Sequence, residues 1–140
     1  MYYVDTSVLV AYYCPEPLSE KAEAFLLGHG QPIISVLTEV ELCSAVARKV
    51  RERLMSKPEA TKITGKFVSH LETDMYGRLP VEPHHYRLAR DWIALFKCNL
   101  KTLDALHLAV ASSEGLPIVT ADQALTDSAK GLGLEGVLVT

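Results

Sequence analysis

The sequence of 140 residues has few cysteines and no long hydrophobic run. Its three cysteines, Cys14, Cys43 and Cys98, are widely spaced and form no CxxC pair, which argues against a disulfide framework and a zinc site. They are typical of small buried residues in a reducing compartment, so we expect a cytoplasmic protein. No stretch of about 18 apolar residues occurs, and no basic segment precedes the N-terminal apolar run. The sequence therefore predicts neither a membrane span nor a signal peptide.

The chain also lacks an overall basic charge, since 14 Lys and Arg against 17 Asp and Glu give a formal charge of −3. The bases are nevertheless concentrated in residues 41–70, where they exceed the acids by four. The seven bases are Arg48, Lys49, Arg51, Arg53, Lys57, Lys62 and Lys66, and the three acids are Glu41, Glu52 and Glu59. Such a run is most often a solvated helix face, and the alternative is a surface that follows nucleic-acid phosphates.

Length and composition are those of one globular domain, and we expect residues 1–140 to form it. A chain of about 150 residues buries roughly 68–70% of its unfolded surface, which allows a substantial core. Apolar residues make up 49% and charged residues 22% of the sequence, as in ordinary soluble proteins.

Short apolar segments alternate with segments of helical periodicity along the whole chain. Strands are expected at 2–4, 32–36, 79–81, 117–120 and 136–139, and helices at 7–13, 20–27, 38–54, 57–76, 83–96, 102–114 and 122–132. This alternation predicts an α/β protein with three layers, α/β/α, around a central parallel sheet of four to five short strands. Only a few residues join the helices 83–96 and 102–114, so these two cannot run in the same direction.

Asp5 is the only charged residue in the apolar run YYVDTSVLVAYY at residues 2–13. Burying an unpaired carboxylate is costly, so its presence there needs an explanation. Asp5 ends the first predicted strand, and the ligand crevice of an open α/β sheet lies beyond the carboxyl ends of its strands. The alternative is that Asp5 only caps the helix that follows.

Three further acids are expected at the same edge. Glu41 and Asp104 lie in the first turns of helices that begin at that edge, and Asp122 follows the fourth strand. Each has a simpler interpretation: Thr38-x-x-Glu41 matches a capping box, Asp104 complements a helix dipole, and Asp122 is a plausible N-cap. Capping does not explain why four acids should meet. Like charges repel by about 3 kcal/mol per pair at ~5 Å and an effective dielectric of ~20. A divalent cation removes that cost, and carboxylates favour Mg²⁺ or Mn²⁺ over zinc.

Four segments in order resemble the four motifs of PIN-domain nucleases. Residues 3–9 read as a strand ending in Asp-Thr-Ser, residues 34–42 carry Ser, Thr and Glu at successive spacings of three, and residues 102–109 and 119–122 resemble the third and fourth motifs. In the second motif this register selects Glu41 and not Glu39. The match spans the chain, whose size resembles that of VapC-type toxins of prokaryotic toxin–antitoxin pairs.

The resemblance implies a PIN-like fold and a metal-dependent endoribonuclease. Asp5, Glu41, Asp104 and Asp122 would hold one or two Mg²⁺ or Mn²⁺ ions, and cleavage would leave a 5′-phosphate and a 3′-hydroxyl. The hydroxyls of Thr6, Ser7 and Thr120 would orient water or the acids, although such residues often cap helices. The implied partners are RNA, a cognate antitoxin and a second copy of the chain. The alternatives are a stand-alone PIN nuclease in RNA processing and a non-catalytic interaction module.

His107 lies three residues after Asp104 on the same helix face. It would either tune the acidic site or be a satisfied core histidine, and its apolar helix favours the core. Helical spacing also favours a core position for Trp92 and Phe96. Tyr12 and Tyr13 precede two prolines, and their exposure there would suit the antitoxin groove that the resemblance places among the early helices.

Overall fold

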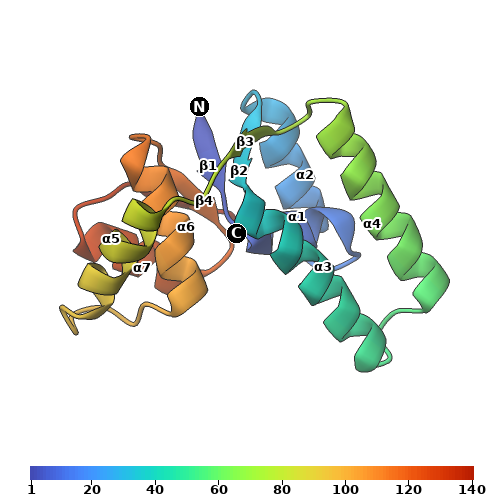
Figure 1. Ribbon diagram of the computed structural model, residues 1–140. Coiled ribbons are helices and arrows are strands. Elements are labelled where there is room, and N and C mark those ends of the chain that lie inside the picture. Colours follow the sequence, from blue (N-terminus) through green and yellow to red (C-terminus); the bar gives the residue numbers. More distant parts are fainter.

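Five short strands form one parallel sheet in the computed structural model, which describes residues 1–140 (Figure 1). The sheet order is β3-β2-β1-β4-β5, and every pair of neighbours is parallel. The strands are β1 (Tyr2–Val4), β2 (Pro32–Ser35), β3 (Gly77–Leu79), β4 (Ile118–Thr120) and β5 (Gly136–Leu138). The predicted parallel α/β architecture is confirmed.

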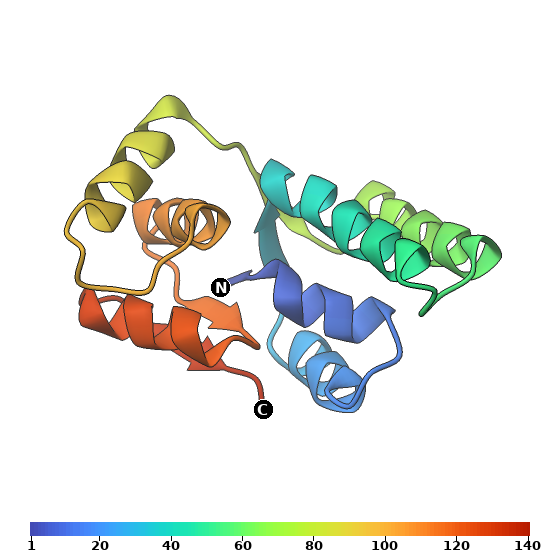
Figure 2. The same cartoon turned by 90° about the horizontal axis from the view of Figure 1, so that it is seen from below.

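Seven helices cover the two faces of the sheet. They are α1 (Thr6–Tyr13), α2 (Ser19–Gly28), α3 (Val36–Arg51), α4 (Lys57–Glu72), α5 (Pro83–Ile93), α6 (Thr102–Ser113) and α7 (Gln123–Gly131). Helices α1 to α4 lie on one side of the sheet and α5 to α7 on the other (Figure 2). None of these helices combines the length and the apolar content that crossing a bilayer requires.

Every predicted element is present, but several ends differ. The largest difference is in α4, which we expected to reach residue 76 and which ends at Glu72. The chain turns at Asp74, whose φ of +57° is incompatible with a continuing right-handed helix. Strand β3 consequently begins at Gly77, two residues before the predicted start.

Alternation along β1 divides the core. Tyr2 and Val4 face the cluster formed with α1 to α4, whereas Tyr3 faces α6 and α7. Because Tyr3 points to the opposite face, its hydroxyl reaches side chains of β2 and α6 that are distant in sequence.

Helix α6 is buried along its centre, from Ala105 to Ala111, as its apolar sequence predicted. Helix α5 packs beside it and runs in the opposite direction (Figure 1), which satisfies the constraint set by their short connection. Phe96 was expected in the core, and this prediction is wrong: its side chain is 89% exposed. The reason is that α5 ends at Ile93, so Phe96 falls in the connecting loop with a φ of +54°.

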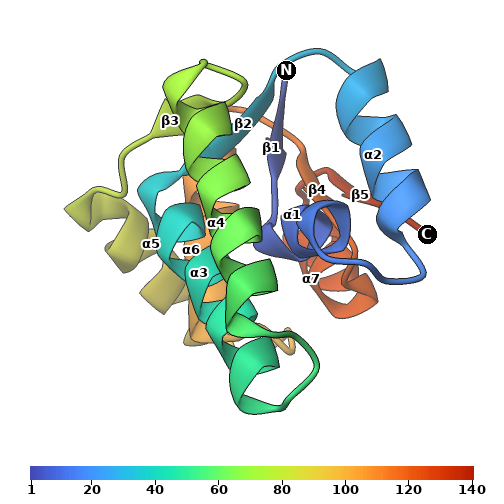
Figure 3. The ribbon, with the colours of Figure 1, turned by 90° about the vertical axis from the view of Figure 1, so that its right-hand side faces the viewer.

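Helices α3 and α4 form a hairpin that projects beyond the sheet (Figure 3). Helix α3 starts directly at the carboxyl end of β2, and α1 starts one residue after β1. The first turns of α1, α3 and α6 therefore meet at the carboxyl edge of the central strands, beside the turn that follows β4.

Candidate active site

The four predicted acids lie in one electrostatic neighbourhood at this edge. The pKa of Asp104 is raised to about 6, first by burial and then by the negative charges of Asp5, Asp122 and, more weakly, Glu41, while His107 opposes the shift. Coulomb interactions weaken with distance, so four acids that affect a single carboxyl group must lie near one another. The topology thus brings together residues that are up to 117 positions apart in the chain, Asp5 and Asp122.

Asp5 is only 5% exposed, and two hydroxyls stabilise its carboxylate. Its Oδ2 accepts a hydrogen bond of 2.6 Å from Ser7 Oγ and one of 2.8 Å from Thr120 Oγ1. Asp5 occupies the N-cap position of α1, but its side chain makes no capping hydrogen bond. The capping interpretation therefore does not explain this carboxylate.

The same two hydroxyls fix the turn after β4. Ser7 Oγ accepts the backbone N–H of Ala121 at 3.0 Å, and Thr120 Oγ1 accepts the backbone N–H of Asp122 at 3.0 Å. The end of β1 and the start of the β4–α7 turn are thus joined through Asp5, so that this carboxylate and Asp122 belong to one hydrogen-bonded unit.

Glu41 lies on α3 with its side chain half-buried. Its Oε1 accepts a 2.7 Å hydrogen bond from Thr6 Oγ1 and also contacts His107 Nε2. Burial alone would raise the pKa of Glu41, but the hydrogen bond and charge of His107, together with Thr6, lower it overall. The alternative interpretation, a capping box of Thr38 and Glu41, is wrong: α3 is capped by Ser35, one turn earlier, with Thr38 as its partner.

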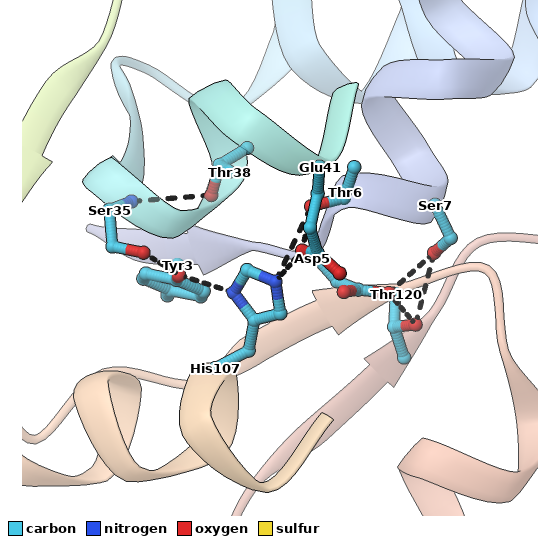
Figure 4. A network of polar contacts seen from close by, with 9 residues as sticks. All are labelled: Tyr3, Asp5, Thr6, Ser7, Ser35, Thr38, Glu41, His107 and Thr120. Atoms are coloured by element: carbon cyan, nitrogen blue, oxygen red, sulfur yellow. Dashed lines mark hydrogen bonds and ion pairs between the residues drawn. The ribbon is translucent and has the colours of Figure 1, made fainter. Parts of the chain in front are cut away.

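His107 is fully buried and lies between Tyr3 and Glu41 (Figure 4). Its Nδ1 is 2.6 Å from the Tyr3 hydroxyl, which itself donates a 2.8 Å hydrogen bond to Ser35 Oγ. Burial lowers the pKa of His107, but the hydrogen bond to Glu41 and the nearby carboxylates, Asp5 among them, raise it above its usual value. The sequence favoured a satisfied core histidine, and His107 is one, yet the partner that satisfies it is a predicted site acid.

Asp104 and Asp122 are less constrained. The Asp104 carboxyl group is half-buried and accepts no hydrogen bond from the protein. Asp122 is exposed, and its Oδ1 accepts the backbone N–H of Ala124 at 2.9 Å. The N-cap interpretation is therefore correct for Asp122, although the cap uses only one of its two oxygens.

Each of the four acids keeps at least one oxygen that accepts no protein hydrogen bond. These oxygens are Asp5 Oδ1, Glu41 Oε2, both oxygens of Asp104 and Asp122 Oδ2. As the side chains stand, no three ligand-type residues are grouped as the ligands of a metal ion would be. The donor chemistry, which consists only of carboxylate oxygens, is nevertheless the kind that hard divalent cations prefer.

A groove of about 430 Å³ extends from this edge along α3. Thr6 and Glu41 line its inner end, and Arg48, Lys49 and Arg51 line the part farther along the helix. The sequence identified an excess of bases but not which of them line the groove. The helical spacing of seven residues from Glu41 to Arg48, two turns on the same face, could have indicated it.

The aromatic residues near the early prolines differ from each other. Tyr13 was expected to be exposed, and this is wrong: it is buried, and its hydroxyl bonds to His70 at 2.7 Å and to Tyr76 at 2.6 Å. Tyr12 is half-buried, with the Lys66 ammonium 5.8 Å from its ring centroid. Only Tyr12 therefore remains available for a partner.

Comparisons with known proteins agree on one family. Residues 2–131 match the family model described as PIN domain. The chain is 29% identical to Ribonuclease VapC46 of Mycobacterium tuberculosis over 136 residues, which cover 94% of the chain and 92% of the relative.

Solved structures of similar proteins show the same fold. The chain superimposes on Mycobacterium tuberculosis VapC20, described as a sarcin-ricin loop cleaving toxin, with a TM-score of 0.73 at 14% identity, covering 91% of this chain and 95% of that one. It also superimposes on VapBC2 from Rickettsia felis with a TM-score of 0.70 at 17% identity, covering 99% and 98%. At these identities the likeness is one of fold.

Proposed function

The chain belongs to the PIN domain family, and we propose that it is a Mg²⁺- or Mn²⁺-dependent endoribonuclease that acts as the toxin of a toxin–antitoxin pair. The relative named as a ribonuclease, similar along almost the whole chain, supports this activity. The observation that carries the proposal is the carboxyl group of Asp104, whose pKa is raised by burial and by three other acids at the same sheet edge. A fold that gathers uncompensated carboxylates has a use for them that stability does not explain.

We propose that Asp5, Glu41, Asp104 and Asp122 hold the ion. Their oxygens without hydrogen bonds are the available donors, and an ion there would relieve their mutual repulsion. The ion would lower the pKa of a bound water and offset the charge that develops on the phosphate during cleavage. The role of this chain is to hold the acids in place, and the hydroxyls of Thr6, Ser7 and Thr120 do so through the bonds described above.

RNA is the substrate that the groove along α3 favours. Arg48, Lys49 and Arg51 line the same groove as Glu41, so a strand whose phosphate reaches the acids passes these bases. Glu52 also lines the groove and pairs with Arg48 at 2.9 Å in an exposed ion pair. Such exposed pairs contribute at most about 1 kcal/mol, so the guanidinium can exchange this partner for a phosphate.

An antitoxin is the second partner that we propose. Solved relatives include toxin–antitoxin complexes, among them VapBC2 from Rickettsia felis, bound to DNA, and a complex from Klebsiella pneumoniae. On this chain the early helices carry the half-buried Tyr12 and the exposed side chains of Leu27 and Val40. We place the antitoxin on this side of the sheet.

A second copy of the chain is the third proposed partner. An apolar groove of about 420 Å³ lies between α5 and α6, and Phe96, almost fully exposed, is part of its lining. In a two-fold dimer the same patch meets itself, so Phe96 of each copy would fill the groove of the other. Size-exclusion chromatography with light scattering should find a dimer, and Phe96→Glu should yield a monomer.

Incubation of the purified protein with mixed cellular RNA, with and without Mg²⁺ or Mn²⁺, tests the activity directly. Sequencing of the new 5′ ends should reveal defined cleavage sites that disappear with EDTA and in Asp5→Asn. The matched control is Glu39→Gln, because Glu39 lies two residues from Glu41 but pairs with Arg78 at 2.9 Å, outside the acidic site. Cleavage that persists with EDTA, or in Asp5→Asn, would refute the metal mechanism.

The alternatives make different predictions. A stand-alone nuclease would lack an adjacent short gene whose product copurifies with the chain and inhibits cleavage. A non-catalytic module would show no saturable binding in a Mn²⁺ titration. The presence of all four acids favours an active enzyme over such a module.

A further inference from the structure

The contact between His107 and Glu41 gives the buried histidine a role in the site. We propose that His107 is a positioning residue: it holds Oε1 of Glu41 through a chain of hydrogen bonds from Ser35 and Tyr3, and leaves Oε2 for a ligand. This inference deepens the proposed function and rests on it. His107 touches neither substrate nor ion in this arrangement, so it acts only through the carboxylate that it holds.

The direction of each hydrogen bond supports this role. The Tyr3 hydroxyl gives its single proton to Ser35 Oγ, so toward His107 Nδ1 it can only accept. The Glu41 carboxylate is an acceptor as well, and Thr6 Oγ1, which is 3.4 Å from Nε2, already donates to Glu41. Nε2 of His107 is therefore the donor toward Glu41.

Burial makes this arrangement rigid. The His107 ring is fully buried on the most enclosed helix of the molecule, and Tyr3 and Ser35 are fully buried as well. Since none of these side chains can exchange its partner for water, the ring has one orientation, and Oε1 of Glu41 is fixed against it. Thr6 holds the same oxygen from α1, so two elements fix Glu41 and neither of them uses Oε2.

The arrangement also explains why Glu41 can approach the other acids. His107 is the only Lys, Arg or His side chain within ion-pair distance of a site carboxylate in the structure. Two glutamates on α3, two residues apart, thus have different partners: Glu39 pairs with Arg78 at the surface, whereas Glu41 is turned inward to His107. This contrast supplies the matched control for the experiment.

A double-mutant cycle in the metal-free protein tests the positioning without reference to activity. His107→Asn retains a donor at the δ position but cannot reach Glu41, and Glu41→Gln removes the carboxylate. We expect the two changes to lower the denaturation midpoint by less together than the sum of their separate effects, because each breaks the same contact. His107→Asn with Glu39→Gln should be additive. Additivity in the Glu41 cycle would overturn the proposal.

Kinetics and metal titration then distinguish positioning from general packing. His107→Gln places its N–H at the ε position, toward Glu41, so it should retain more function than His107→Asn. For His107→Asn we expect kcat and Mn²⁺ affinity to fall about 10- to 100-fold, with KM for RNA unchanged. Equal losses in both variants, or a change in KM alone, would contradict the role. If the wild type binds no Mn²⁺ and cleaves no RNA, the proposed function fails, while the double-mutant cycle still decides whether His107 positions Glu41.

Discussion

The four acids at the sheet edge form two pairs that the protein treats differently. Asp5 and Glu41 are held: each has an oxygen that accepts two contacts from side chains of other elements. Asp104 and Asp122 are open: no side chain donates to either, and Asp122 has only a backbone N–H. Both pairs come from the same edge, so position in the sheet does not explain the difference.

The difference shows how a fold can tolerate repelling charges. Partners supplied by α1, β4 and α6 contact the held acids, and for Glu41 the bonds from His107 and Thr6 lower the pKa. Asp104 has no such partner, and burial with its neighbours raises its pKa to about 6. Side chains of the protein thus fix the held pair before any ligand binds. The open pair lacks such side-chain partners, so a bound ligand would have to stabilise it.

Substitution of a held acid should have the largest effect on activity. Asp5→Asn keeps the size of the side chain and one oxygen for Ser7 and Thr120, but removes the charge. We expect kcat/KM for RNA cleavage to fall by about 10³-fold, equivalent to about 4 kcal/mol, with little change in the denaturation midpoint of the metal-free protein. If the free energy of unfolding instead drops by about 1 kcal/mol or more while activity is retained, the role of Asp5 is structural.

Of the held pair, Glu41 lines the basic groove, and RNA binding tests the role of that groove. Charge reversal at Arg48 and Arg51 should weaken binding at low salt by about 10-fold or more and flatten its salt dependence by roughly 0.7 per lost phosphate contact. Lys57→Glu with Lys62→Glu is the matched control, because these lysines belong to the same basic run but do not line the groove. Equal effects of the two pairs would mean that overall charge, and not the groove, binds RNA.

Substitution of the open Asp104 should stabilise the metal-free protein. Asp104→Asn removes the repulsion, and we expect a gain on the order of 1 kcal/mol at pH 7 after allowing for solvent screening. The folded state holds the Asp104 proton more tightly than the unfolded state does. The wild type should therefore lose stability relative to Asp104→Asn as pH rises from about 4 to about 6. Urea denaturation across this range, without metal, measures the difference between the two proteins.

The effect of metal on stability should show the opposite trend with pH. Binding requires ionised Asp104, so Mn²⁺ should raise the melting temperature of the wild type more at pH 7.5 than at pH 5. Asp104→Asn should lose most of this increase at both values. An increase that is independent of pH and unchanged in Asp104→Asn would place the ion elsewhere.

The smallest stability effect is expected at the open Asp122, where the two roles can be separated. Asparagine caps helices as well as aspartate does, so Asp122→Asn should preserve stability within a few tenths of a kcal/mol while reducing metal-dependent cleavage. Asp122→Ala loses the bond to Ala124 as well and should cost up to about 1 kcal/mol. Full activity in Asp122→Asn would limit this residue to capping.

Several features of the fold and site followed from local pattern. The alternation of short apolar segments with helical periodicity predicted all five strands and seven helices, because both periods are properties of consecutive residues. The predicted topology also indicated which acids share an edge, and the motif resemblance selected Glu41 over Glu39. Errors arose where a single backbone conformation ended an element, as at Asp74 and Phe96.

The partners of the acids did not follow from the sequence. A capping box of Thr38 and Glu41 was the alternative that their spacing allowed, but Ser35 takes the capping role and Glu41 turns inward. His107 was correctly expected to be a buried histidine, yet nothing near it in the chain indicated a bond to Glu41, which is 66 positions away.

The sequence by itself determined the elements, their order, the parallel sheet and the four acids at its carboxyl edge, because periodicity and strand direction are set locally. Only the tertiary structure decided which acids are held and which are open, and which three bases line the groove. The physical reason is that a side chain finds its hydrogen-bond partner by proximity in space. Asp5 contacts Thr120, 115 positions away in the chain, and Tyr3 contacts His107, 104 positions away. These residues come together only when the layers of the fold pack.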